Sequence, residues 1–382
     1  MYARAGAVHA LCAIVSALSA WPVLAAGPDT ESSSWVQRVE PSDGKDNPAA
    51  ARPKSAPPSK AVDKPSAASA PAAKAFAQPE VSAKPAKDDK QKPPAAGANP
   101  ASTIGDEAYD DFDQGRYLAA LKKATEAAKA GEPAAHTLIG RIHGGGLGVP
   151  HNDVLAAEWY RKAADLGDVE GAFAMGVMLA EGRGVAKDRG AAGKYFETAA
   201  YKGHALANYN LALLFLSGDG KPENPTRAAQ HLAVAAQAGY AQAQYDLGAM
   251  FQNGEGVDAD ALQAATWLGK AAAQGLPAAQ FDYSVMLFKG QGLTKDEPKA
   301  FQYMKSAAEK GVPPAQNRLA RLYAFGVGVE KNLAEAAKWH LIAKRGGRDD
   351  PQLEEMLAKL PKADRATAEK AAATWHDRSL VE

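Results

Sequence analysis

Apolar residues recur at intervals of three and four along much of the second half of the chain, and residues 240–275 show the pattern clearly. The first half of this segment carries Ala243, Leu247, Met250 and Phe251, and its second half carries Ala264, Trp267, Leu268, Ala271 and Ala272. Such spacing places each set on one stripe of an α-helix. The segment therefore predicts two amphipathic helices that pack against each other as a hairpin.

Glycines punctuate this hairpin. Gly254 follows the first apolar run. Because it has no Cβ atom, it can adopt the left-handed conformation that ends a helix. Gly256 then lets the chain turn back, and Gly275 ends the second helix. These positions predict where each helix stops.

The same glycines recur at a fixed interval of 36 residues. They close six units, which are 132–167, 168–203, 204–239, 240–275, 276–311 and 312–347. Each unit also has glycines at its fifteenth and seventeenth positions, such as Gly146 and Gly148. A single hairpin cannot bury its apolar face alone, so neighbouring units must stack. The sequence predicts an all-α solenoid of stacked 36-residue hairpins.

Both ends of the array predict capping elements. Residues 103–131 keep the apolar register of a hairpin but have a shortened loop around Gly115, which indicates a degenerate N-terminal unit. In residues 348–382, Asp349-Asp350-Pro351 is a helix-start signal for a helix through Leu360. Pro361 begins another helix through about Arg378. We interpret these two helices as a C-terminal cap.

The repeat units resemble a known family. The sequences AQYDLG at 243–248, GEGV at 254–257 and AATWLGKAAAQG at 264–275 are similar to the Sel1-like repeat, a relative of the tetratricopeptide repeat. Unit 132–167 has the matching run AAEWYRKAADLG at 156–167. The resemblance spans 132–347 and implies a right-handed α-solenoid. Proteins of this type are adaptors and regulators, often exported or associated with the bacterial envelope.

The first hundred residues have a different composition. Residues 1–26 have Arg4, a short apolar run and small residues before a cleavage point after Ala25 or Ala26, which predicts a signal peptide. Residues 27–102 are rich in Pro, Ala and Lys, so we expect a disordered linker. The protein should then be periplasmic or secreted. An uncleaved N-terminal anchor facing the periplasm is the alternative. The single cysteine, Cys12, lies inside the signal, so no disulfide is expected.

The charge and the motifs of the sequence argue against nucleic-acid binding, a metal site and a catalytic site. The net charge is zero and no basic stripe is interleaved with aromatics, so nucleic acid is not expected as a partner. His136, His143 and His151 lie close in sequence, but no nearby carboxylate or cysteine completes a metal site, and His143 falls at a packing position. Ser42 and Lys45 form a Ser-x-x-Lys pattern inside the linker. We therefore predict no catalytic residues, no cofactor and no metal.

Binding has a better candidate on the first helix of each unit. The sixth positions hold Phe173, Tyr209, Tyr245 and Phe281, and the tenth positions add Val177, Leu213 and Val285 between Arg141 and Arg321. In tetratricopeptide-like stacks this face lines a concave groove, where aromatics anchor peptides. The two arginines are candidates to clamp acidic groups. The alternative interpretation is that the rings only pack between adjacent first helices.

Two function classes follow. The favoured one is a non-enzymatic envelope scaffold or regulator that binds a protein or peptide partner in the solenoid groove. The other is an enzyme or binder that acts on a cell-wall component. A continuous apolar strip favours the first, and a deep pocket with converging carboxylates or histidines favours the second. The sequence does not identify the partner, the pathway or the oligomeric state.

Overall fold

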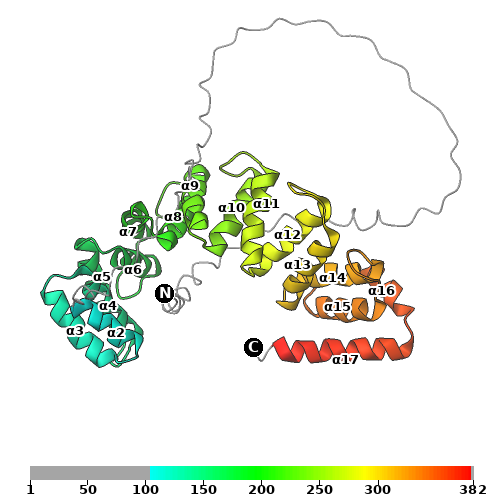
Figure 1. The fold of residues 1–382 in the computed structure, drawn as a ribbon, viewed down its shortest axis with the longest axis horizontal. Coiled ribbons are helices and arrows are strands. Elements are labelled where there is room, and N and C mark those ends of the chain that lie inside the picture. The colour runs from blue at the N-terminus through cyan, green and yellow to red at the C-terminus, as the bar shows by residue number, and fades with distance from the viewer. Residues whose placement is uncertain (1–103, 380–382) are drawn as a thin grey trace, which may run out of the picture. The chain divides into compact units, whose positions relative to one another are not determined.

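The computed structural model describes residues 104–379, and within that range every regular element is an α-helix (Figure 1). The N-terminal hairpin is α2 (Ile104–Asp113) and α3 (Tyr117–Lys129). Twelve helices form the six units: α4 (Pro133–Gly145), α5 (Asp153–Asp165), α6 (Val169–Glu181), α7 (Arg189–Tyr201), α8 (Ala205–Ser217), α9 (Pro225–Gln237), α10 (Ala241–Asn253), α11 (Ala261–Ala273), α12 (Pro277–Lys289), α13 (Glu297–Glu309), α14 (Pro313–Phe325) and α15 (Leu333–Arg345). The last two are α16 (Pro351–Ala358) and α17 (Lys362–Ser379).

Local sequence explains where the helices of each unit begin and end. The first helices all stop at a left-handed glycine, with φ between 61° at Gly146 and 79° at Gly182. The second helices all begin after an Asn or Asp whose side chain accepts a backbone hydrogen bond, as Asn152 does from Leu155 at 3.0 Å. Such a cap satisfies one of the N–H groups that a helix start leaves unpaired. The loop between the two helices is therefore fixed at both ends.

Small residues let the two helices of a hairpin approach closely. A Cβ atom placed on Gly176 would lie 2.6 Å from the Phe196 ring of the facing second helix, and one on Gly248 would lie 2.8 Å from Leu268. Phe196 and Leu268 are both fully buried at these contacts. The ninth position of the unit is thus kept small so that a large side chain from the second helix can fill the gap.

The second loop glycine joins one unit to the preceding one. A Cβ atom on Gly256 would overlap the backbone of Pro225, and one on Gly292 would overlap the Ala261 carbonyl. In both cases the neighbour is the first residue of the second helix in the preceding unit. These glycines therefore serve in the contact between units as well as in the turn.

Contacts run mainly between helices that are adjacent in the chain, and each hairpin packs on the next. At the C-terminal end, α17 packs on α15, where the Trp375 and Trp339 rings lie 5.8 Å apart. Consecutive helix hairpins without strands confirm the predicted all-α solenoid for residues 104–379. The signal peptide and linker predictions for residues 1–102 lie outside this range. Between residues 104 and 379, no helix combines the length and the apolar character that a membrane span needs.

Candidate functional site

The sixth and tenth positions of the units form the candidate binding surface, here called the first-helix strip. Its members are Phe173, Tyr209, Tyr245 and Phe281 at sixth positions, with Arg141, Val177, Leu213, Val285 and Arg321 at tenth positions. Phe173, Tyr209 and Tyr245 are 1, 5 and 7% exposed. Phe281, Leu213, Val285 and the two arginines are half-buried. The strip thus contains both packed and accessible side chains.

Sixth-position rings pack against the following unit, either on a residue of its first helix or on the residue just before that helix. Phe173 stacks on His204 with 4.5 Å between ring centroids, and Tyr209 meets Tyr240 edge-on at 4.8 Å. The half-buried Phe281 has the Arg318 guanidinium over its face at 4.8 Å. Packing between adjacent first helices therefore accounts for Phe173 and Tyr209, whereas the face of Phe281 is covered by an arginine.

Two carboxylates lie beside these rings, one position further along the next first helix. Asp282 accepts a hydrogen bond from the Tyr245 hydroxyl at 3.0 Å, and burial raises the pKa of its carboxyl. Asp246 accepts from Gln242 at 3.0 Å. Burial raises the Asp246 pKa to about 6, although its interactions with Gln242 and Tyr209 oppose that rise. Because no cation balances Asp246 among the residues placed in the structure, a cationic partner group would stabilise its charged form.

The two arginines at the ends of the strip differ in environment. Arg321 donates two hydrogen bonds to Asp350, which also accepts one from Asn317 at 3.1 Å. Arg141 instead lies over the Phe112 ring at 5.1 Å, and no carboxylate pairs with it between residues 104 and 379. Arg321 is therefore engaged within the fold, and Arg141 is the arginine of the strip that keeps its hydrogen-bonding capacity.

The Arg141 side chain lines a cavity of about 200 Å³ between α2, α4 and α6. The apolar part of its lining comes from Phe112, Leu147, Ala174, Val177 and Met178. Its polar groups come from Arg141, Arg183 and Tyr160. Tyr160 is 7% exposed, and burial raises its pKa to about 12, so the hydroxyl stays protonated. The cavity combines an apolar lining with hydrogen-bond donors.

Two glycines create this hollow. Gly144 and Gly145 occupy the thirteenth and fourteenth positions of their unit, where the other units carry at least one larger side chain, such as Phe288 and Lys289. Both glycines line the cavity. The space therefore depends on a departure of unit 132–167 from the other units.

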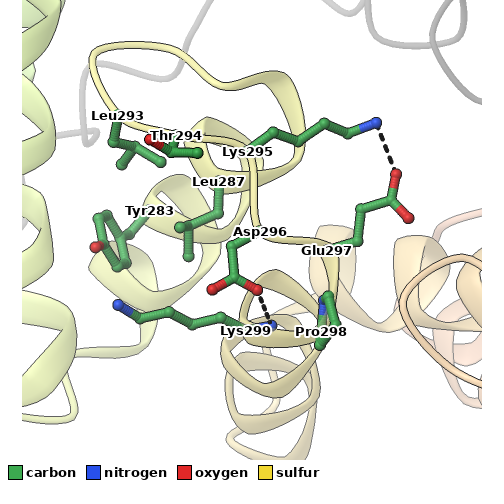
Figure 2. A pocket seen from close by; sticks show the side chains of 9 residues that line it. All are labelled: Tyr283, Leu287, Leu293, Thr294, Lys295, Asp296, Glu297, Pro298 and Lys299. Atoms are coloured by element: carbon green, nitrogen blue, oxygen red, sulfur yellow. Dashed lines mark hydrogen bonds and ion pairs between the residues drawn. The ribbon is translucent and has the colours of Figure 1, made fainter.

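A larger hollow of about 570 Å³ lies under the loop between α12 and α13 (Figure 2). Its charged groups are satisfied locally. Asp296 caps α13 by accepting from the Lys299 N–H at 3.0 Å, and Lys295 pairs with Glu297 at 2.7 Å. The Lys299 ammonium lies 5.8 Å from the Tyr283 ring centroid. The polar lining of this hollow is thus committed to the loop and the helix start.

The three N-terminal histidines make separate contacts. The His136 ring interacts with the Glu132 carbonyl oxygen at 2.9 Å and packs on Trp159, and His151 pairs with Asp153 at 3.2 Å. Burial lowers the pKa of His143. Across residues 104–379, no group of three or more His, Cys, Asp or Glu side chains is arranged to hold a metal ion.

Sequence reasoning missed Tyr160, Arg183, Asp246 and Asp282. The glycine pair at 144–145 and the acidic residues at the seventh position of two consecutive units are visible in an alignment of the six units. Those departures from the repeat pattern could have indicated a site in the sequence. Nothing in the sequence indicated Arg183, because it faces the cavity only through the packing of one unit on the next.

Comparison with known proteins identifies the repeats. The family model described as Sel1 repeat matches residues 133–168, 169–204, 205–240, 241–276, 277–312 and 313–347. Its boundaries begin one residue later than those read from the glycines. No curated protein sequence matches the chain significantly.

Solved structures with the same fold include two that are more than 25% identical to this chain. A Sel1 repeat protein from Oxalobacter formigenes is 28% identical, with a TM-score of 0.55, over 65% of this chain and 99% of its own. A protective antigen of uropathogenic Escherichia coli strains, described as displaying an SLR fold, is 26% identical, with a TM-score of 0.52, over 72% of this chain and 68% of its own.

Proposed function

The chain belongs to the Sel1 repeat family, and we propose that it is a non-enzymatic periplasmic or envelope scaffold that binds a protein or peptide partner along the first-helix strip. Proteins built from Sel1 repeats are commonly scaffolds for protein interaction. The location rests on the signal-peptide features of residues 1–26. The partner surface rests on the side chains of the strip.

The observation that carries the proposal is the set of half-buried apolar residues that two first helices, α8 and α12, present at strip positions. Leu213 and Val285 occupy tenth positions, and Phe281 occupies a sixth position. A rigid array of this kind presents apolar contacts at a fixed repeat spacing, which suits an extended or helical segment of a partner. Such side chains contribute to affinity when a partner excludes water from them.

Charge along the strip adds specificity. Arg141 lies at the N-terminal end of the strip, and Asp246 lies beside the strip in the fourth unit. Neither charge is balanced by an ion pair within residues 104–379. A partner with an acidic group at one end and a basic group further along would match both. Electrostatic complementarity of this kind sets orientation and partner choice.

Substitution of the strip tests the proposal. The double variant Leu213→Lys/Val285→Lys places charges on the half-buried apolar positions. Its matched control, Val234→Lys/Leu262→Lys, changes the same residue types on second helices, where those side chains are 40 and 62% exposed. We expect the strip variant to lose partners that wild type and control capture from envelope extracts, with unchanged helical dichroism. Equal capture by all three proteins would refute the strip as the binding surface.

Location has its own test. N-terminal sequencing of the protein purified from the envelope fraction should give a chain that begins at Ala26 or Gly27, after cleavage at Ala25 or Ala26. A chain that retains Met1 and sediments with membranes would support the anchored alternative. Recovery of the uncleaved chain in the cytoplasmic fraction would contradict both.

A further inference from the structure

The cavity beside Arg141 is lined by hydrogen-bond donors that have no acceptor among the described residues. Within residues 104–379 the Tyr160 hydroxyl has no hydrogen-bond partner, although its ring is buried. In the same range the Arg141 guanidinium lies over the Phe112 ring and has no carboxylate within ion-pair distance, although it interacts electrostatically with Glu170. Neither donor has a hydrogen-bond partner among the described residues and both line the same hollow, so both are available to a ligand that presents an anionic acceptor.

The charge of the cavity comes from Arg141. Arg183 also lines the hollow, but it binds Asp153 at 2.7 Å and lies 3.6 Å from Glu181. Glu170 is the other nearby acid: it contacts His204 at 3.1 Å and interacts with Arg141 only electrostatically, beyond ion-pair distance. Arg141 is therefore the cation of the cavity with no carboxylate in direct contact, and an apolar surround strengthens its attraction for an anion.

The size of the cavity limits its occupant. About 200 Å³ is less than the 300–1,000 Å³ typical of sites for cofactors and drug-sized ligands. It suits a single amino-acid residue. An anionic group would meet Arg141 and the Tyr160 hydroxyl, while an apolar side chain would contact Val177 and Met178.

We propose that this cavity binds the C-terminal residue of a partner protein, with its free carboxylate on Arg141 and Tyr160 and its apolar side chain in the hollow. A chain terminus carries both groups on one residue. Val177 also belongs to the first-helix strip, and Leu213 follows at the same position of the next unit. In this proposal the residues before the terminus pass from the cavity toward the half-buried Leu213. The inference rests on the proposed function and specifies which part of the partner binds at the N-terminal end.

A labelled peptide tests this directly with the full-length protein. The probe is a fluorescein-labelled hexapeptide, Gly-Ser-Gly-Ser-Ala-Leu, with a free C-terminal carboxylate, and its partner probe has the same sequence with a C-terminal amide. Fluorescence anisotropy should show at least tenfold weaker binding of the amide, which corresponds to about 1.4 kcal/mol. N-acetyl-leucine as competitor should displace the probe only at concentrations at least tenfold above the Kd of the peptide.

Three variants separate the contributions. Arg141→Leu should weaken binding of the peptide with the free carboxylate at least tenfold. It should also abolish the preference of the protein for this peptide over the amide. Tyr160→Phe removes only the hydroxyl, which has no hydrogen-bond partner among the described residues. It should therefore weaken binding of the acid peptide about threefold while the thermal unfolding midpoint stays unchanged. Arg161→Leu removes the same charge from an exposed site on α5 and should have no effect.

The results that overturn the inference are distinct from those that overturn the proposed function. Equal binding of acid and amide, a preference that survives Arg141→Leu, or absence of peptide binding up to millimolar concentration each refutes the carboxylate site. Equal affinity for N-acetyl-leucine and the peptide would assign the cavity to small carboxylic acids instead. If envelope partners are still lost from the Leu213→Lys/Val285→Lys variant, the scaffold function stands without this site.

Discussion

Arg321 binds Asp350 through two parallel hydrogen bonds, from Nε to Oδ2 at 2.6 Å and from Nη2 to Oδ1 at 2.9 Å. The same carboxylate caps the start of α16 by accepting from the Leu353 N–H at 3.2 Å. Asp350 is 4% exposed. One buried acid thus joins the last repeat to the C-terminal cap.

Asp350→Asn should therefore destabilise the C-terminal end by about 2–3 kcal/mol at pH 7, because Arg321 would keep its charge without a partner. Burial raises the pKa of Asp350, but the bonds from Arg321 outweigh this and hold it below 3.8. An acid with a lowered folded pKa stabilises the fold above the unfolded value and loses that effect as pH falls. The difference between wild type and variant should shrink below about pH 4 in thermal unfolding followed by dichroism.

Asp349→Asn is the control for this prediction, because Asp349 is adjacent but its side chain is 72% exposed. It should change the unfolding midpoint little at either pH. Equal destabilisation by the two variants would show that the Arg321 pair contributes nothing specific.

Asp246→Asn should have the opposite effect. Burial raises the pKa of this carboxyl to about 6. A raised folded pKa means that the fold favours the protonated acid, so stability is lost as pH rises from about 4 to 6. The variant should be more stable than wild type by roughly 1–3 kcal/mol at pH 8 and no more stable at pH 4. Urea unfolding at both pH values measures this, with the exposed Asp258→Asn as control.

Gly292→Ala and Gly311→Ala separate backbone conformation from contact between units. Both glycines have positive φ, 68° and 81°. A Cβ atom on Gly292 would overlap the Ala261 carbonyl, whereas one on Gly311 meets nothing within 4 Å. We expect Gly311→Ala to cost about 1–2 kcal/mol from the left-handed backbone alone. Gly292→Ala should cost at least twice as much in urea unfolding, and equal costs would contradict the interlocking role of the seventeenth position.

Tyr245→Phe should destabilise the contact between the fourth and fifth units. The Tyr245 hydroxyl donates to Asp282 at 3.0 Å, and its loss leaves a buried carboxylate without that donor. The expected cost is about 1–3 kcal/mol at pH 8. Thermal unfolding measures it, and Tyr303→Phe, which removes a hydroxyl without a partner in the structure, should be close to neutral. If the two variants behave alike, the Tyr245–Asp282 bond does not hold the units together.

Much of the fold is readable from residue order because its signals are local. Helix ends at Gly146 and Gly254 follow from a backbone conformation that glycine adopts without a Cβ clash. The apolar interval of three and four identifies the buried face of each helix. Asp350 before Pro351 marks the start of α16, because both act within one helical turn.

The candidate site was only partly accessible to the same reasoning. Sequence register places Arg141 and Arg321 at the same position of their units, yet one faces a cavity and the other binds Asp350. Likewise Tyr209 and Phe281 share a position but differ in exposure, because the next unit places a different neighbour against each ring: Tyr240 against Tyr209 and Arg318 against Phe281.

The sequence by itself determined the unit length, the helix limits and the side of each helix that is buried, since these depend on residues within one hairpin. Only the tertiary structure decided which arginine has hydrogen-bond donors without a carboxylate partner and which loop glycine contacts the preceding unit. Those properties depend on side chains about 30 residues apart that meet when one hairpin packs on the next.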